Sequence, residues 1–199
     1  MADSFQTSNL VPTGSAIVTH IKRIRMAVSL NGVPPAEMAA TPAFLPWSSN
    51  LLALHSDALF HSFRNEPDTA LFPSFGTETG CRDFMHALQS LDQFCPESTW
   101  LAMDANRAIG TIQGLIMPNN EGEIQNLSVL ASERGKGIGS GLLMHGLEGF
   151  RRAGCSRVVL EVSASNLPAI RLYRKFGFSS YKTVYLPTYG SLPSLGLDI

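Results

Sequence analysis

The chain has 199 residues, of which 44% are hydrophobic and 16% are charged, and its formal net charge is −1 at pH 7. This composition is that of a globular domain able to bury a core, and it excludes bulk electrostatic attraction to nucleic acid. The three cysteines, Cys81, Cys95 and Cys155, follow no disulfide or zinc spacing and indicate free thiols. No apolar segment reaches membrane-spanning length and no signal-peptide core is visible, so we expect a cytoplasmic protein without membrane or metal.

Apolar periodicity predicts an alternation of strands and helices along one domain, residues 16–186. In chain order the predicted elements are a strand within 16–30, helices at 51–63 and 82–94, strands at 99–103, 108–117 and 123–130, a helix at 138–152, a strand at 156–163, a helix at 168–176 and a strand at 181–185.

Three further segments lack this periodicity. Residues 1–15 have the composition of a disordered leader, and residues 187–199 are expected to form a loosely ordered tail. Residues 31–46 contain four prolines and are expected to form a loop or a short extended piece. We find neither a second domain nor an internal repeat.

The most informative segment is a glycine-rich turn, Arg134–Gly139, between the strand at 123–130 and the helix at 138–152. A glycine-rich turn that opens a helix leaves backbone N–H groups unpaired, and the helix dipole favours negative charge beside them. Glycines also lack the Cβ atoms that would keep a ligand away from the backbone. The turn therefore predicts an anion-binding site.

Spacing separates this turn from two nucleotide-binding motifs. The chain contains no Gly-x-x-x-x-Gly-Lys-Ser/Thr string, so it lacks a mononucleotide P-loop. In the dinucleotide pattern Gly-x-Gly-x-x-Gly, the third glycine position falls on Ser140 or on Leu142, so neither reading frame fits. A nucleotide-binding module remains an alternative, which preferential binding of ATP or NAD would favour.

Two linked motifs resemble the GNAT superfamily of acyl-CoA-dependent N-acetyltransferases. Arg134, Gly137 and Gly139 match its Gln/Arg-x-x-Gly-x-Gly/Ala signature. About thirty residues later, Asn166–Phe178 matches its Asn-x-x-Ala-x-x-Leu-Tyr-x-x-x-Gly-Phe signature at every defined position. In this second segment, a proline at the first helical position and a glycine at the C-terminal cap indicate a short helix.

The resemblance implies an α/β GNAT fold, a mixed, twisted sheet with helices on both faces. It implies that the strand ending at Val129 and the strand at residues 157–162 splay apart, so that pantetheine lies between them. It also implies acetyl transfer from acetyl-CoA to an amine by direct attack in a ternary complex, with no metal. A non-catalytic acyl-CoA-binding or regulatory domain is the main alternative.

The resemblance also implies a set of cofactor-binding residues. The glycine turn would receive the pyrophosphate on its backbone N–H groups, and Leu127 and Val129 would offer backbone pairing to pantetheine, with the Val129 N–H polarising the thioester carbonyl. Asn166 would contact the cofactor as well. The predicted residues of the turn are Arg134, Gly135, Lys136, Gly137, Ile138 and Gly139. A solvent-exposed loop lysine is the alternative for Lys136, and a helix-entry residue is the alternative for Asn166.

Two side chains are candidates for proton transfer. Tyr173 resembles the family's tyrosine near the thioester sulfur, where a phenol can donate a proton to the leaving thiolate. Its alternative is a packed helix-face tyrosine. Strand alternation assigns Glu123 to the same face as Leu127 and Val129, and its distance of eleven residues from Arg134 resembles family members with a glutamate base. The alternative for Glu123 is a solvated turn carboxylate. The acceptor, a small-molecule or peptide amine, cannot be read from the sequence, and a homodimer is possible.

Overall fold

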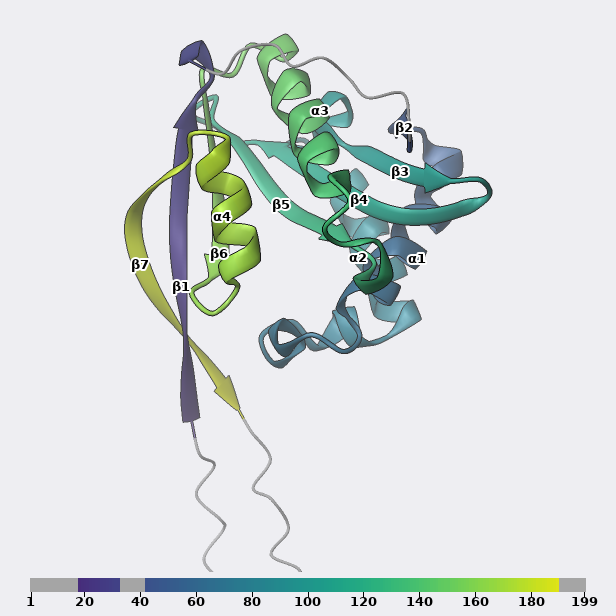
Figure 1. The fold of residues 1–199 in the computed structure, drawn as a ribbon, viewed down its shortest axis with the longest axis horizontal. Coiled ribbons are helices and arrows are strands. Elements are labelled where there is room, and N and C mark those ends of the chain that lie inside the picture. The colour runs from purple at the N-terminus through teal and green to yellow at the C-terminus, as the bar shows by residue number, and fades with distance from the viewer. Residues whose placement is uncertain (1–17, 33–41, 190–199) are drawn as a thin grey trace, which may run out of the picture.

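The computed structural model describes residues 18–32 and 42–189, which form a seven-stranded mixed sheet with helices on both faces (Figure 1). The predicted leader at 1–15 and residues 190–199 of the predicted tail lie outside the described residues. The elements are β1 (Val18–Ser29), β2 (Ala43–Pro46), α1 (Leu52–Phe63), α2 (Glu78–Gln89), β3 (Trp100–Asp104), β4 (Arg107–Ile116), β5 (Gly122–Val129), α3 (Ile138–Arg152), β6 (Arg157–Ser163), α4 (Leu167–Lys175) and β7 (Ser179–Tyr189).

The strands are ordered β2-β3-β4-β5-β6-β1-β7 across the sheet. Every neighbouring pair is antiparallel except β5 and β6, which run parallel. The first strand of the chain therefore lies between β6 and β7, near the end of the sheet opposite to β2. The short extended piece expected in the proline-rich segment is β2, which pairs with β3.

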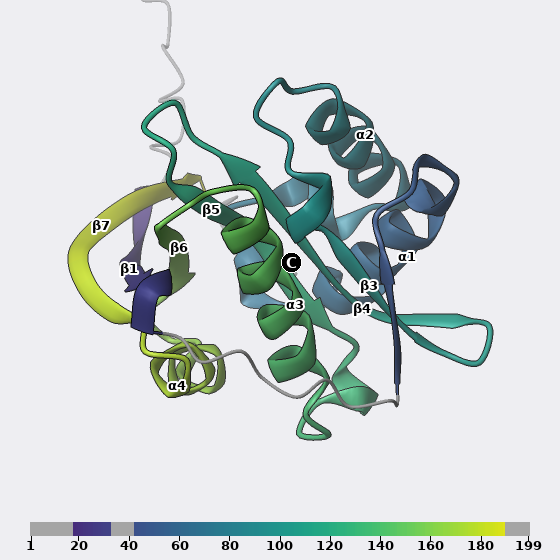
Figure 2. The same cartoon turned by 90° about the horizontal axis from the view of Figure 1, so that it is seen from above.

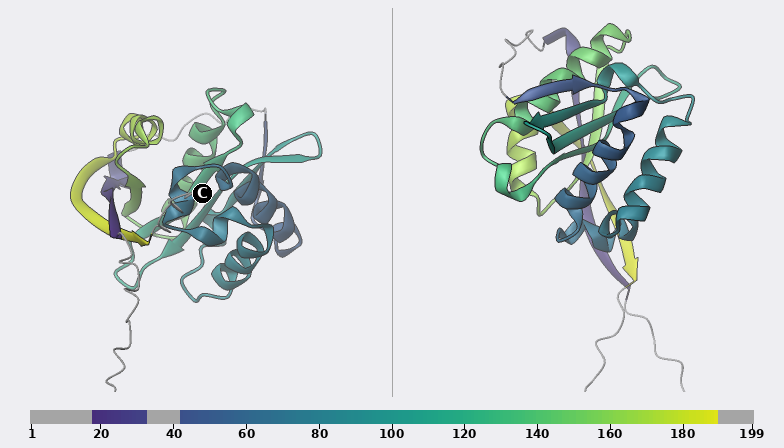
Figure 3. Two further views of the ribbon diagram at one scale, coloured as in Figure 1. Left: turned by 90° about the horizontal axis from the view of Figure 1, so that it is seen from below. Right: turned by 90° about the vertical axis from the view of Figure 1, so that its right-hand side faces the viewer.

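Each face of the sheet has its own pair of helices, as Figures 2 and 3 show. On one face, α3 and α4 cover a core that includes Leu142, Phe150 and Ile170. On the other, α1 and α2 cover a second core that includes Leu59 and Met85. The amphipathic patterns of the sequence predicted these four helices, because each helix buries one apolar stripe. Within the described part of the chain, no helix is long and apolar enough to span a membrane.

Most predicted elements agree with the structure, and two, the second helix and the last strand, differ by two or more residues at both ends. The second helix begins at Glu78 instead of residue 82, because the Thr77 hydroxyl accepts a hydrogen bond from the Gly80 N–H (3.0 Å) and caps an earlier start. It ends at Gln89 instead of residue 94. The last strand, β7, runs to Tyr189, three residues beyond the domain limit expected at 186.

A bulge in β5 determines which side chains face which layer. Gln113 of β4 pairs with Asn126, whereas the next residue, Gly114, pairs with Ile124, so Gln125 is an extra residue in β5. An extra residue in one strand interrupts the alternation of side chains between the two faces. The same strand diverges from its other neighbour at this point, since β5 pairs with β6 only as far as Ile124. The splay that the family resemblance implied is therefore present, and it begins at the bulge.

Candidate functional site

The backbone at the end of β5 points into the gap left by the splay. A hydrogen bond from the Leu130 amide to the Ile109 carbonyl (3.0 Å) flanks the pair formed by Val129 and Gly110. In an antiparallel ladder such a pair exchanges no hydrogen bonds of its own, so the N–H and C=O of Val129 point away from β4. Leu127, two residues earlier, has the same orientation. These two residues therefore direct backbone groups toward the side where β6 has separated.

The glycine-rich turn adjoins the end of this strand. Gly135 and Gly137 have φ angles of +80° and +85°, a left-handed conformation that glycine adopts without strain. Gly137 is the N-cap of α3 and has no side chain to pair with the first amides of the helix. A Cβ at Gly139 would lie 3.4 Å from Leu172 of α4 and 3.7 Å from Val129, so α3 begins between β5 and α4. The N–H groups of this helix start are available to an anion.

A cleft of about 770 Å³ combines the strand end, the glycine turn and the face of α4. Its lining includes nine of the eleven predicted site residues: Leu127, Val129, Arg134, Gly135, Gly137, Ile138, Gly139, Asn166 and Tyr173. Lys136 and Glu123 do not line it. The cleft thus unites predicted residues that lie up to 46 positions apart in the chain, from Leu127 to Tyr173.

The two basic residues of the turn have protein partners. Arg134 donates from Nε to the Val129 carbonyl (3.1 Å), and its Nη2 lies 2.7 Å from a carboxylate oxygen of Glu66. Lys136 pairs with Glu133 at 2.9 Å. A hydrogen bond from Lys136 holds the pKa of the Glu133 carboxyl below its usual value. Arg134 therefore joins the turn to the strand end, and the ammonium of Lys136 is turned toward Glu133.

Tyr173 lies in the cleft and is nearly buried, with 7% of its surface exposed. Burial raises the pKa of its phenol to about 12, while the charge of Arg23 opposes the shift and that of Asp68 adds to it. A phenol with this pKa keeps its proton at neutral and mildly alkaline pH. Tyr173 can therefore act as a hydrogen-bond donor toward an anion in the cleft.

Asn166 begins α4 and also lines the cleft. Its side-chain oxygen accepts a hydrogen bond from the Ala169 amide at 3.1 Å, which is an N-cap. The side-chain oxygen of Asn166 therefore has the role predicted for a helix-entry residue. The side-chain NH₂ group is not used by this cap.

The expected common face of Glu123, Leu127 and Val129 is wrong. Glu123 pairs with Leu115, which packs in the core beneath α1 and α2, whereas Leu127 and Val129 pack against the core beneath α3 and α4. The bulge at Gln125 causes this reversal. The carboxylate of Glu123 accepts a hydrogen bond from the Gln125 side chain at 2.9 Å.

The wall of the cleft opposite α4 was missed by the sequence analysis. It is formed by the end of α1, the 3-10 turn η3 (Pro67–Ala70) and the segment between them, which contribute Ser62, Phe63, Glu66 and Asp68. The sequence analysis predicted no helix or strand between the helices at 51–63 and 82–94. The only signal was the pair of acidic residues in this segment, Glu66 and Asp68, two positions apart. Arg171 and Lys175, which add positive charge on the α4 side, were also missed.

Comparison with known proteins agrees with this geometry. The family model described as "Acetyltransferase (GNAT) family" matches residues 60–178, more than half of the chain. The chain belongs to the GNAT acetyltransferase family. Among the described residues, no group of three or more His, Cys, Asp or Glu side chains could hold a metal ion.

Curated relatives of this GNAT chain carry two kinds of name. A mycothiol acetyltransferase of Thermomonospora curvata is 36% identical over 97 residues, which are 49% of this chain and 33% of that protein. The N-alpha-acetyltransferase MAK3 of Arabidopsis thaliana is 33% identical over 93 residues, 45% of this chain and 49% of that protein. The matches thus span between about a third and a half of these two relatives.

Solved structures support the fold. A GCN5-related N-acetyltransferase from Sphaerobacter thermophilus superposes with a TM-score of 0.67 at 23% sequence identity, covering 85% of this chain and 51% of that one. At this identity the similarity establishes the GNAT fold and not a substrate.

Proposed function

We propose that the chain is an N-acetyltransferase that transfers an acetyl group from acetyl-CoA to an amine acceptor, by direct attack in a ternary complex. The observation that carries the proposal is a single cleft onto which three features open: the outward-facing backbone of Leu127 and Val129, the glycine turn, and the Tyr173 phenol. Residues of both GNAT signatures contribute to it.

The residues of the cleft fit acetyl-CoA, which the family implies and which would supply the acetyl group as a thioester. A Cβ at Gly135 or Gly137 would have no atom within 4 Å, so these positions border open space from which a pyrophosphate could approach the backbone. Leu127 and Val129 would pair with the amides of the pantetheine arm, and the Val129 N–H would polarise the carbonyl. The remaining cofactor-binding residues in the proposal are Arg134, Ile138, Gly139 and Asn166, which line the cleft, and Lys136, which does not line it and would offer its backbone N–H.

Two proton-handling roles complete the proposal. Tyr173 would stabilise the departing thiolate through its protonated hydroxyl group. An aliphatic ammonium has a pKa near 10 and must lose a proton before it can attack. The side chain of Glu123 lies on the α1 and α2 side of β5 and does not line the cleft. Glu123 would therefore accept this proton through an intervening water molecule.

The test begins with thermal-shift measurements in the presence of CoA, ATP and NAD. An amine panel follows, containing spermidine, kanamycin, free amino acids and a peptide with a free N-terminus, with free-thiol release from acetyl-CoA as the readout. We expect stabilisation by CoA and turnover of at least one amine. Stabilisation by CoA without any turnover would favour a non-catalytic acyl-CoA-binding domain. Preference for ATP or NAD would contradict the cofactor assignment.

A further inference from the structure

A buried arginine ties the α1 side of the cleft to the sheet. Arg23 of β1 is only 6% exposed, and its Nη1 group lies 3.4 Å from Asp68 of η3 and 3.0 Å from the hydroxyl of Ser163. That hydroxyl in turn donates to the other oxygen of Asp68 at 2.6 Å. The guanidinium also lies over the ring of Phe72, 5.4 Å from its centroid. Asp68 is therefore held by two partners from the sheet.

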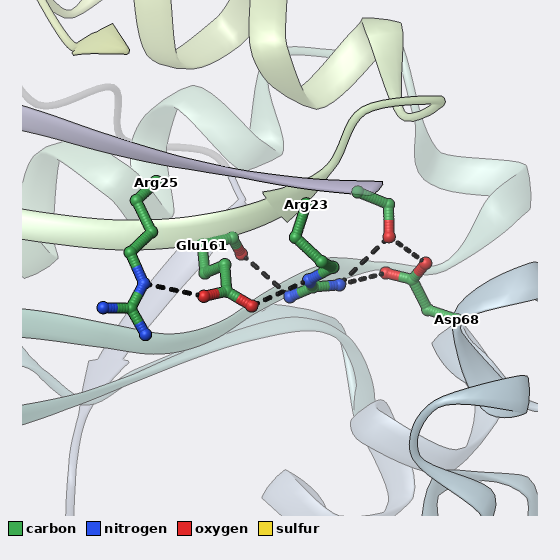
Figure 4. Close-up of polar contacts among 5 residues, drawn as sticks. Arg23, Arg25, Asp68 and Glu161 are labelled. Atoms are coloured by element: carbon green, nitrogen blue, oxygen red, sulfur yellow. Dashed lines mark hydrogen bonds and ion pairs between the residues drawn. The ribbon is translucent and has the colours of Figure 1, made fainter. Parts of the chain in front are cut away.

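Four side chains of alternating charge, including Arg23, form a row that ends at the cleft. Figure 4 shows the order Arg25, Glu161, Arg23, Asp68, with Glu161 between the two arginines. Arg23 donates from Nε to the Glu161 carboxylate at 3.1 Å and from Nη2 to the Glu161 backbone carbonyl at 3.2 Å. Both distances are shorter than the 3.4 Å between Nη1 of Arg23 and the Asp68 carboxylate. Within this row Asp68 therefore pairs with one arginine, Arg23, which also pairs with the carboxylate of Glu161. It is also the member of the row that lines the cleft.

The two other carboxylates of the cleft lie closer to their cations. Glu66 lies 2.7 Å from Arg134, and Glu133 lies within 2.9 Å of both Arg107 and Lys136. The side chain of Asp68 keeps 23% of its surface exposed. Burial is the main cause of the raised pKa of Tyr173, and the charges of Arg23, which lowers it, and of Asp68, which raises it, both act on the phenol, so this pair lies near it. A cation that enters the cleft beside Tyr173 meets in Asp68 the lining carboxylate whose own cation is most distant, at 3.4 Å.

The energetics of such a row favour an orienting role over a stabilising one. Removing two opposite charges from water costs about as much as their attraction returns, so a buried ion pair contributes little net stability. A guanidinium has a fixed planar geometry with several donors, and it therefore fixes the direction of the carboxylates that it contacts. Arg23 with Ser163 determines where the Asp68 carboxylate points.

We propose that Asp68 binds the ammonium group of the acceptor amine, and that Arg23 and Ser163 are positioning residues which hold its carboxylate on the cleft wall. This inference rests on the proposed acetyltransferase function. It states that the acceptor amine is protonated, and is therefore a cation, when it binds. A carboxylate that meets an ammonium through charge-assisted hydrogen bonds favours charged amines over neutral molecules of the same shape.

Steady-state kinetics with the most active amine of the panel test this assignment. Asp68→Asn keeps the size of the side chain and an oxygen for the Ser163 hydroxyl but removes the charge. It should raise the KM for the amine about tenfold or more and leave the KM for acetyl-CoA unchanged. Asp57→Asn is the matched control, because Asp57 is an exposed carboxylate on α1 that pairs with His61 and does not line the cleft.

Two further measurements separate binding from catalysis and from folding. Calorimetry of the same amine with the CoA-saturated protein should show weaker binding for Asp68→Asn than for Asp57→Asn, without any turnover. Arg23→Lys and Ser163→Ala should raise the KM for the amine in the same direction, to a smaller extent. Equal amine affinity in the two aspartate variants would overturn the role of Asp68 while leaving the acetyltransferase proposal intact. A parallel rise in both KM values would also overturn it, since that pattern indicates a disturbed cleft. A wild-type protein that acetylates no amine would overturn the function itself.

Discussion

Ile124 and Leu127 pack into the same core, although they are three residues apart in one strand. The bulge at Gln125 is the cause, because one extra residue exchanges the two faces of the strand for everything that follows it. Because of this exchange, the side chain of Glu123 lies on the sheet face opposite to the side chains of Leu127 and Val129. The exchange also assigns this carboxylate to the side of the sheet occupied by α1, from which we expect the amine to approach.

The role of Glu123 can be tested by its dependence on pH. If this carboxylate accepts the proton of the amine through water, Glu123→Gln should lower kcat/KM most near neutral pH. Higher pH should restore much of the loss, because the free amine becomes plentiful as the pH approaches its pKa of about 10. The measurement is a pH–rate profile of both proteins, with Glu121→Gln in the preceding turn as a control. Parallel profiles without alkaline recovery would assign the proton to another acceptor.

Tyr173 should affect the chemical step more than cofactor binding. Tyr173→Phe keeps the packing of α4 and removes the hydroxyl group that would stabilise the leaving thiolate. We expect kcat to fall about tenfold or more, with little change in the KM for acetyl-CoA. Because burial raises the pKa of the phenol to about 12, the wild-type rate should show no loss from its ionisation up to about pH 10. Tyr181→Phe, at an exposed position of β7, should behave as wild type. Full turnover by Tyr173→Phe would make this residue a packing group.

Stability should depend on pH through His55, which is fully buried in α1. Burial lowers its pKa from 6.5 to about 3, and its Nδ1 lies 2.7 Å from the hydroxyl of Thr111. Between these values the unfolded chain binds a proton that the folded chain does not, so stability falls as the pH falls. The loss should approach about 1.4 kcal/mol per pH unit well below pH 6.5.

Urea denaturation between pH 7 and pH 5 measures this slope, in a range above the acidic titration of the carboxylates. His55→Gln, which can retain a hydrogen bond to Thr111, should flatten the dependence. His61→Gln, at the exposed end of the same helix, should keep it. The same slope in His55→Gln and wild type would show that His55 does not carry the effect.

Most of the fold could be predicted from the sequence, because each helix and strand displays its buried stripe as a period of apolar residues. That the two signatures lie together at one cleft was also predictable, since both are local: the glycine turn and the α4 segment each lie within thirteen consecutive residues. The start of α2 was missed because Thr77, which caps it, precedes the apolar stripe.

The wall that we propose as the acceptor side could not be predicted, because its contacts join residues that are distant in the chain. Arg23 and Asp68 are 45 positions apart, and nothing local to either one indicates the other. Gln125 is an ordinary strand residue, so the bulge that separates Glu123 from Leu127 has no sequence signal of its own. The partner of Lys136 is three residues away, but strand and turn patterns do not determine the direction of a long flexible side chain.

The most direct test of the cofactor site compares two glycines at opposite ends of α3. Gly137 and Gly154 have φ angles of +85° and +86°, and a Cβ at either one would meet no atom within 4 Å, so aspartate should strain both positions similarly. Calorimetric titration with CoA should show that Gly137→Asp weakens binding by about 2 kcal/mol or more, since it adds a negative charge where the pyrophosphate would bind. Gly154→Asp should bind CoA as wild type does. Wild-type CoA affinity in a folded Gly137→Asp protein would contradict the assignment of this cleft to acetyl-CoA.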